Sequence, residues 1–204
     1  VAQVVDKQAL DVRVDSVVDE PEPQPHVTVI QALPKGERGE LAVEVLTEVG
    51  VDTIVPWAAA TSVAVWKGER AARSHQRWAD AAHAAAKQAR RARFPEVTPL
   101  VRTADVVERV RSASLALVLH EEGTSSIGTV SLPTDGEVVV IVGPEGGLTE
   151  EERAGFRAVG ALEVRLGPSV LRTSSAGIAA VAALLAGSPR WAVPGDPRVR
   201  GWSS

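Results

Sequence analysis

Glycine and proline cluster in two short segments of this 204-residue chain, and these segments carry its clearest chemical signal. The first is Val142-Gly143-Pro144-Glu145-Gly146-Gly147, and the second is Leu166-Gly167-Pro168-Ser169-Val170-Leu171-Arg172-Thr173-Ser174-Ser175-Ala176. Each follows an apolar run typical of a buried strand, residues 138–142 and 164–166, and each precedes a helix signal. Since glycine has no Cβ, a ligand can approach the backbone of such loops closely. We therefore expect a cofactor pocket at the carboxyl edge of a parallel sheet, where open α/β sheets usually bind ligands.

The composition excludes several classes of protein. Hydrophobic residues make up 45% of the chain and charged residues 24%, as in an ordinary globular domain. The longest apolar run, residues 176–186, has about half the length that a membrane span needs, so we expect no membrane segment and a cytoplasmic protein. Cysteine is absent, and the histidines show no zinc-like spacing, so we expect no metal site. The net charge of −4 argues against a uniformly basic surface for nucleic acid, but it allows a local basic patch.

The residue pattern divides the chain into parts. Residues 1–20 alternate as a strand does, with Leu10, Val12 and Val14 on one side, which predicts the C-terminal part of a small, truncated β domain. Residues 21–25 form a stiff, proline-spaced linker. Strands and helices alternate over residues 26–186, and residues 187–204 form a C-terminal extension to which we assign no role.

The alternation over residues 26–186 predicts an α/β fold whose parallel sheet is covered by helices on both faces. Strands are expected at 27–30, 52–55, 115–120, 138–142 and 164–166, and Pro56 is expected to close the second. Helices are expected at 38–49, 71–93, 103–111 and 175–186. Another helix begins after Thr149, which forms a capping box with Glu152. The helix at 175–186 is apolar on nearly all sides, which suits either a dimer interface or burial within one subunit.

Several segments, taken in order, resemble one known family. Residues 143–147 followed by 149–152 are similar to the cofactor loop of the ribosomal RNA small-subunit methyltransferase E family, and residues 166–176 are similar to its second cofactor segment. Upstream, the resemblance includes Glu48-Val49-Gly50-Val51 and a helix carrying Arg77, Trp78, Gln88, Arg91, Arg93 and Pro95. It covers roughly residues 26–186 and identifies the chain as a member of this family, which belongs to the SPOUT superfamily of trefoil-knotted methyltransferases.

The resemblance implies a fold, a reaction and partners. The fold is a SPOUT-type trefoil-knotted parallel sheet with helices on both faces, preceded by the remnant of a PUA-like, RNA-binding β-barrel. The reaction is methylation of N3 of a specific uridine in small-subunit (16S) ribosomal RNA, with S-adenosyl-L-methionine as cofactor. The partners are the RNA or 30S subunit and a second copy of the chain. The chain departs from the family where it has Ser169 in place of a frequent Arg, Ser174-Ser175 in place of Glu-Thr, and Ala60-Thr61-Ser62-Val63 in place of a charged motif.

The predicted cofactor residues come from the two loops and the strands beside them. The adenine of the cofactor needs a flat apolar slot edged by amide donors and carbonyl acceptors. Apolar side chains at the strand ends supply the walls and the loop backbones supply the edges. The predicted set is Leu119, Val142, Gly143, Pro144, Glu145, Gly146, Gly147, Leu166, Gly167, Val170, Leu171, Arg172, Thr173 and Ala176.

Arg172 is also the candidate catalytic side chain. Methylation of N3 of uracil requires loss of its proton and leaves charge on the flanking oxygens, which a fixed guanidinium can stabilise. The alternative for Arg172 is an ion pair with Glu145 or with a partner subunit. Glu145 itself either braces the first loop or is a plain surface residue.

A basic stretch, Lys87, Arg90, Arg91 and Arg93, is the candidate RNA contact, because phosphate contacts position RNA on a protein. Its alternative is a solvated helix end whose positive charge complements the helix dipole. Two further functions stay open: a knotted methyltransferase acting on a different RNA or base, and a non-catalytic RNA-binding or ribosome-assembly protein of the same fold. A phosphate-binding nucleotide hydrolase is excluded, because no Gly-Lys-Ser/Thr follows a glycine-rich loop.

Overall fold

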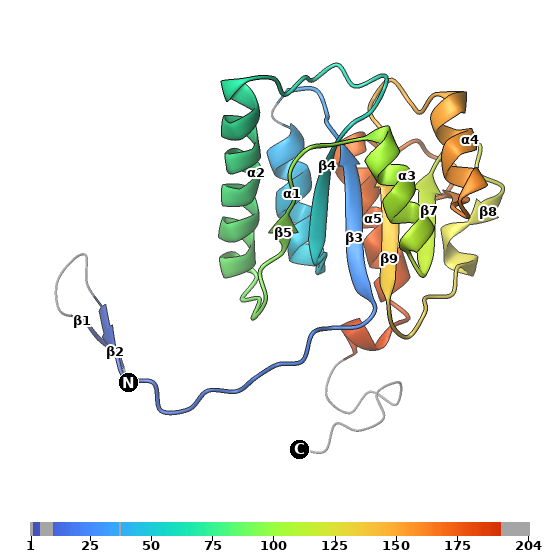
Figure 1. Cartoon of the computed structure of the whole chain (residues 1–204). Helices are drawn as coiled ribbons and strands as arrows, with labels where there is room; N and C mark the ends of the chain where they lie inside the picture. The colour runs from blue at the N-terminus through green and yellow to red at the C-terminus, as the bar shows by residue number, and fades with distance from the viewer. Residues whose placement is uncertain (1, 5–9, 37, 193–204) are drawn as a thin grey trace.

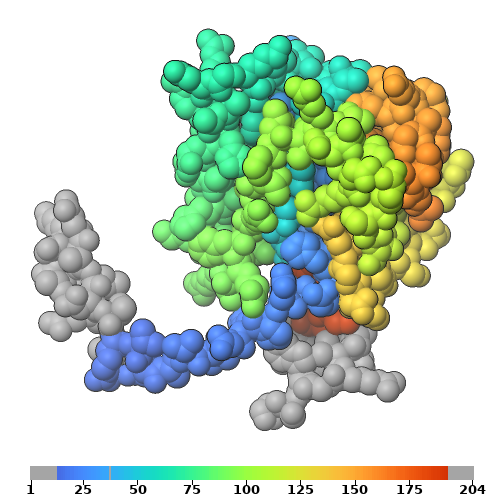
Figure 2. Space-filling model, in the orientation of Figure 1, coloured from blue at the N-terminus to red at the C-terminus, as the bar shows by residue number. Residues whose placement is uncertain are grey.

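The computed structural model describes residues 2–4, 10–36 and 38–192. Near the N-terminus, β1 (Ala2–Val4) and β2 (Leu10–Val12) pair as antiparallel strands. Residues 13–24 then run as an extended segment with mostly exposed side chains (Figure 2). Residues 21–24 of the expected proline-spaced linker lie in this segment, and Pro25 at its end is buried.

The main sheet is parallel throughout and has eight strands in the order β5-β4-β3-β9-β7-β10-β8, with β6 also pairing with β4. Its strands are β3 (His26–Ala32), β4 (Thr53–Ala58), β5 (Glu96–Val97), β6 (Val101–Arg102), β7 (Leu115–Leu119), β8 (Ser125–Ser126), β9 (Glu137–Val142) and β10 (Leu162–Arg165). The predicted parallel sheet is confirmed. The short strands β5, β6 and β8 were not predicted.

Helices cover both faces of this sheet, as predicted (Figure 1). One apolar core lies between the sheet and α1 (Arg38–Val49), α2 (Glu69–Gln88) and α5 (Thr173–Leu185). The other lies between the sheet and α3 (Thr103–Ser112) and α4 (Glu150–Ala158), and it contains Trp57 and Phe156 packed edge to face. Short 3₁₀ helices lie at Ile127–Thr129 and Pro189–Trp191.

Pro56 does not close the second strand, which corrects the sequence prediction. The carbonyl of Trp57 accepts a hydrogen bond from Leu33 on the β3 side, and the carbonyl of Ile54 accepts one from Thr98 on the other side. Alternation along the strand turns the nitrogen of Pro56 toward that second side, between the places where β5 and β6 pair with β4. The missing N–H therefore falls where the ladder is already interrupted, and β4 continues through the proline.

Helix α2 ends at Gln88 rather than at the predicted Arg93. Arg90 adopts φ 54, the amide of Arg91 donates to Ala86 O, and the amide of Arg90 donates to Lys87 O. These two bonds form a Schellman motif, which stops a helix at a left-handed residue. The sequence offered no glycine as a stop signal, because here an arginine takes the left-handed conformation.

Asp52, just before β4, joins four parts of the fold. Its carboxylate accepts hydrogen bonds from the backbone amide of Val27 at 2.8 Å, from Arg190 at 2.6 Å and from Arg91 at 3.4 Å. Arg91 also donates to Thr47 O and Val51 O at the end of α1, while Arg190 donates to Gly50 O and Pro25 O. Burial is the largest influence on Arg91 and lowers its pKa, although Asp52 opposes the shift. The beginning of the C-terminal extension therefore has a structural role through Arg190.

Asp52→Asn is expected to lower the free energy of unfolding by about 3–5 kcal/mol, because it leaves buried guanidinium charges uncompensated. The side chains of Asp52, Arg91 and Arg190 are 9%, 14% and 7% exposed. Urea denaturation measures the loss. Glu108→Gln is the control, since it breaks the exposed Glu108–Arg111 pair and should cost about 1 kcal/mol or less. Equal losses for the two variants would contradict the role given to Asp52.

Candidate active site

Three strand ends meet at one edge of the sheet and build the site. β7 lies between β9 and β10, with Val118 opposite Ile141 and Leu119 opposite Val164. Because all of these strands are parallel, their carboxyl ends open on the same edge. The segments that follow them are the β7 turn (residues 120–123), the first loop (143–148) and the second loop (166–172).

The first loop is closed by a tight turn and is held by hydrogen bonds from the chain after β4 and from the start of α4. The amide of Gly147, which has φ 75, donates to Pro144 O at 2.9 Å. Thr61 Oγ1 donates to Gly147 O at 2.6 Å. At the end of the loop the predicted capping box is confirmed: Thr149 and Glu152 exchange hydrogen bonds at the start of α4. The carboxylate of Glu152, only 5% exposed, also accepts from the amide of Ala60 at 2.9 Å, so the chain after β4 is fixed against the loop.

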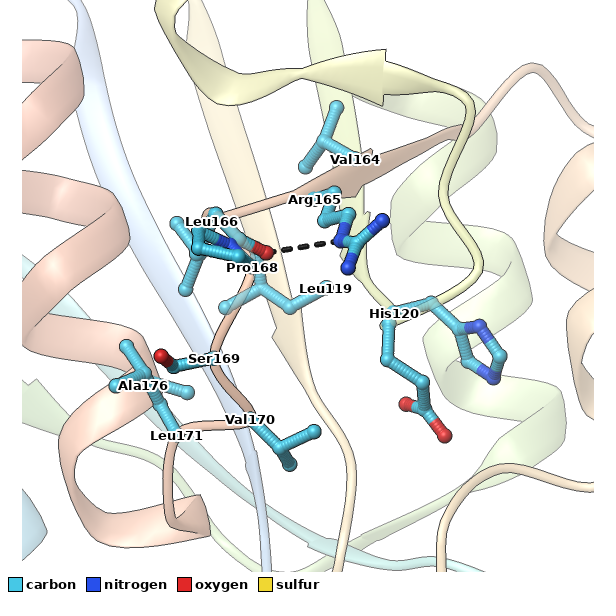
Figure 3. A pocket seen from close by; sticks show the side chains of 12 residues that line it. Leu119, His120, Val164, Arg165, Leu166, Pro168, Ser169, Val170, Leu171 and Ala176 are labelled. Carbon is cyan, nitrogen blue, oxygen red and sulfur yellow. Dashed lines mark hydrogen bonds between the residues drawn. The ribbon is translucent and has the colours of Figure 1, made fainter.

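The second loop leaves β10 through Gly167, whose backbone adopts a positive φ that glycine tolerates much better than other residues do. Gly167 has φ 138, and its carbonyl accepts a hydrogen bond from Arg165 Nε at 2.8 Å, the dashed line in Figure 3. The loop ends at Arg172, whose carbonyl accepts from the amides of Ser175 and Ala176 at the start of α5. Val170 is 80% exposed and Leu171 39% exposed, so the tip of the loop presents apolar side chains to solvent.

The β7 turn holds His120 in a defined orientation. The amide of His120 donates to Val164 O, and the amide of Glu122 donates to His120 Nδ1 at 3.1 Å. A neutral His120 therefore carries its proton on Nε2. A Cβ at Gly123 would lie 2.7 Å from the backbone of Val164, so the turn packs closely against β10.

Arg153 on α4 ties these parts together. Its guanidinium, 15% exposed, donates to Glu163 on β10 at 2.9 Å and to Glu122 of the β7 turn at 3.1 Å. The hydrogen bonds from Arg153, assisted by Arg157, lower the pKa of Glu163 to about 2, so this carboxylate stays ionised at neutral pH. One side chain thus connects the helix after the first loop, the strand before the second loop and the β7 turn.

Between these segments lies a pocket with two lobes. Lobe one, with a volume of about 100 Å³, is lined by the end of β10 and the second loop together with Leu119, His120, Glu121 and Ala176 (Figure 3). Lobe two, with a volume of about 420 Å³, is lined by residues 142–148 and 170–173. The lobes share the residues Leu119, His120, Glu121, Val170, Leu171 and Ala176. A small organic ligand could span both lobes, because they share these lining residues.

The structure brings together every residue of the predicted cofactor set, and each lines one or both lobes. Their contact with a cofactor stays a prediction. The sequence set omits other lining residues: His120, Glu121, Leu148, Val164, Arg165, Pro168 and Ser169. Glu121, Pro168 and Ser169 directly follow a predicted strand or lie within a predicted loop, and His120, Val164 and Arg165 lie in the last residues of predicted strands, so the positions of the strand ends could have found them.

The structure bears on the role of Glu145 and on the alternative of an ion pair with Arg172, whereas a pair of Arg172 with a partner subunit stays open. Glu145 braces the loops, since its carboxylate accepts from the amide of Lys35 at 3.2 and 3.3 Å and lies 3.9 Å from the guanidinium of Arg38. Arg172 is exposed, lines lobe two and forms no ion pair with Glu145 or with any other residue that the structure describes. Its guanidinium is therefore available to a ligand in lobe two.

The predicted RNA patch lies away from this pocket. Helix α2 runs opposite to the strands and ends at their amino edge, where Glu96 pairs with Thr53 at the start of β4 (Figure 1). Lys87 and Arg90 are exposed there, and Arg93 donates to Glu20 O in the extended segment at 2.7 Å. The prediction that Arg91 contacts RNA is corrected, because its guanidinium is already hydrogen-bonded to Asp52 and to backbone carbonyls at the end of α1.

The described part of the chain contains neither a metal-binding cluster nor a membrane-spanning helix. Residues 2–4, 10–36 and 38–192 contain no group of three or more His, Cys, Asp or Glu side chains arranged to hold a metal ion. Over the same residues, no helix has both the length and the apolar character to cross a membrane.

Comparison with known proteins shows consistent similarity. A family model described as an RNA methyltransferase domain matches residues 20–185. The chain is 45% identical over 175 residues to the ribosomal RNA small subunit methyltransferase E of Mycobacterium tuberculosis, an alignment that covers 84% of this chain and 67% of that protein. It is 30% identical over 165 residues to the protein of that name in Bacillus subtilis, covering 78% of this chain and 64% of the relative. The chain thus spans about two thirds of the length of these relatives.

Solved structures agree with the sequence relatives. A ribosomal RNA small subunit methyltransferase E from Neisseria gonorrhoeae, bound to S-adenosyl methionine, matches with a TM-score of 0.74 and 30% identity over 81% of this chain and 68% of that chain. A protein of Legionella pneumophila in complex with the same cofactor matches with a TM-score of 0.80 and 30% identity over 91% of this chain and 76% of that chain.

Proposed function

This chain belongs to the ribosomal RNA small subunit methyltransferase E family, and we propose from that premise that it transfers a methyl group from S-adenosylmethionine to N3 of a uridine in small-subunit ribosomal RNA. The observation that carries the proposal is the two-lobed pocket at the ends of β7, β9 and β10, with Arg172 at its rim and without an ion pair to any described residue. The methyltransferase domain comprises residues 26–186 in this proposal.

The residues of the pocket fit the cofactor. Leu119, Leu166, Val170 and Leu171 make lobe one a mainly apolar slot, suited to adenine, and backbone groups of the second loop edge it. A Cβ at Gly167 would meet no atom of a described residue within 4 Å, so this glycine faces open space of the kind that a closely bound ligand fills. Lobe two is larger and is bordered by the first loop and Arg172, so we assign it to the methionine part and the target base.

The chain contributes orientation and charge to the reaction. S-Adenosylmethionine supplies a methyl group already activated on a sulfonium, so no metal or protein nucleophile is required. The two loops align the methyl group with N3 of the base, and alignment alone accounts for a large share of the rate enhancement. As N3 loses its proton, negative charge spreads to the flanking oxygens, where the guanidinium of Arg172 stabilises it.

The direct test supplies S-adenosylmethionine labelled in its methyl group and unmethylated 30S subunits, then identifies the labelled nucleoside by mass spectrometry. N3-Methyluridine is the expected product. Label on another base or another RNA would favour a knotted methyltransferase of different specificity. Cofactor binding without any transfer would favour a non-catalytic RNA-binding or assembly role.

We further propose RNA contacts and a topology for the whole domain. Lys87, Arg90 and Arg93 contact RNA phosphates outside the pocket, and Arg91 is left out because it is committed to Asp52. The pair β1–β2 belongs to a PUA-like RNA-binding β-barrel. The trefoil knot also remains part of the proposal. It is supported by the return of the chain from β10, near one side of the sheet, to α5, which packs against α1, β3 and β9.

Gly167→Val is expected to abolish the binding of one S-adenosylmethionine per subunit, because it changes the backbone of the second loop and adds a branched side chain beside lobe one. Gly160→Val is the matched control, since Gly160 also has a positive φ and open space around it but lies outside the pocket. Both variants carry similar backbone strain, of about 1–3 kcal/mol. Calorimetry that finds unchanged affinity in Gly167→Val, or equal loss in both, would contradict the pocket.

Arg172→Ala is expected to lower the methylation rate at saturating substrate about 10²–10³-fold while changing RNA affinity little, since its charge acts mainly in the transition state. Arg172→Lys should recover part of the rate, because it restores the charge without the planar fork. Arg111→Ala, an exposed arginine on α3, is the control. A loss seen only in RNA affinity would assign Arg172 to binding instead.

We propose a homodimer in which the exposed side of α5 faces a second copy. A substitution of Leu184 cannot test this contact, because Leu184 is 7% exposed and belongs to the core shared with α1. Leu184→Glu would therefore unfold the subunit. Ala183 is exposed on the same helix, and Ala183→Arg should shift the protein from dimer to monomer in sedimentation velocity at micromolar concentration. Ala84→Arg, at an exposed position of α2, should leave the dimer intact. A monomeric wild-type chain would refute the proposal.

A further inference from the structure

The loop between β3 and α1 places basic residues beside lobe two without contributing to its lining. Lys35, Gly36, Arg38 and Leu41 border an open hollow of about 550 Å³. This hollow adjoins the first loop, because Glu145, which lines lobe two, contacts both the amide of Lys35 and the guanidinium of Arg38. A ligand leaving lobe two past Glu145 therefore meets Lys35 and Arg38 first.

Three described cations, Lys35, Arg38 and Arg172, lie around the mouth of lobe two, together with the carboxylates of Glu121 and Glu145. Among the described residues, Glu145 accepts from the backbone amide of Lys35 and lies 3.9 Å from the guanidinium of Arg38, so its charge faces Arg38 and not the side chain of Lys35. The side chain of Lys35 makes no hydrogen bond or ion pair with a described residue, Arg38 is 46% exposed, and Arg172 is unpaired across the lobe. Some exposed arginines elsewhere have an acidic partner on the same helix, as Arg73 has in Glu69 and Arg111 has in Glu108. The exposed side chains of Lys35 and Arg172, which have no ion pair with a described residue, favour an anion at the mouth of lobe two.

We propose that Lys35 and Arg38 bind the backbone phosphates that flank the target nucleotide of the RNA. The inference rests on the proposed function and adds to it the path of the strand. A base held in lobe two must be turned out of its stack, and the phosphates on either side of it then lie at the mouth of the pocket. Phosphate contacts at that place fix the register of the strand, while the lobe reads the base. The cofactor does not need these cations, since neither lines a lobe.

The test measures binding of unmethylated small-subunit ribosomal RNA to the 204-residue chain at several salt concentrations, together with methylation kinetics and S-adenosylmethionine affinity. The variants are Lys35→Ala with Arg38→Ala, and as a charge-matched control Arg73→Ala with Arg111→Ala, all at exposed positions. The rim variant should reduce the slope of log affinity against log salt by about 1 per cation removed. It should also lower kcat/KM about tenfold or more, while cofactor affinity stays unchanged. Lys35→Arg with Arg38→Lys should retain most of the wild-type slope.

Three results would overturn the inference: an unchanged slope, an equal change in the control, or a loss of cofactor affinity, which would assign the rim to the carboxylate of the cofactor. Failure of the proposed function looks different. The wild-type chain would then bind the cofactor and transfer no methyl group to small-subunit RNA, and the salt slopes would still decide whether Lys35 and Arg38 contact phosphate.

Discussion

The site depends on Arg153 and its contacts with Glu163 and Glu122. The parallel register of β7, β9 and β10 brings three strand ends to one edge, but loops at a sheet edge are free to diverge. Arg153 joins the helix after the first loop to the strand before the second loop and to the β7 turn. Its guanidinium and the carboxylate of Glu163 are 15% and 14% exposed, so solvent screens this pair less than it screens a surface pair.

A second connection, at the opposite edge of the sheet, keeps the ends of the domain in place. Asp52 unites the linker, the end of α1, the chain after α2 and the short helix at Pro189–Trp191 through Arg91 and Arg190. The two connections divide the molecule: the pocket and the basic rim at Lys35 and Arg38 lie at the carboxyl edge, whereas the Asp52 cluster and the exposed Lys87 and Arg90 lie at the amino edge. An RNA that touches both edges would extend well beyond the target nucleotide.

Local signals made much of the fold and the pocket predictable. The apolar strands, the capping box of Thr149 and Glu152, and the glycine-containing loops all act within a few residues, so the sequence alone indicates them. The features that the sequence did not predict depend on contacts between segments that are far apart in the chain. β5, β6 and β8 exist through pairing with neighbours, Pro56 is tolerated because of where those pairings stop, and Arg91 binds Asp52 on a distant segment. The rim at Lys35 and Arg38 was also not predicted, because Lys35 lies beside the first loop only through the pairing of β3 with β9.

Hydrogen–deuterium exchange with and without saturating S-adenosylmethionine tests most directly the claim that three strand ends form one cofactor pocket. Bound cofactor should slow exchange in peptides from the β7 turn, the first loop and the second loop with the start of α5, and leave exchange unchanged around Asp52 and at the end of α2. Protection of only one of the three segments, or protection centred elsewhere, would contradict it.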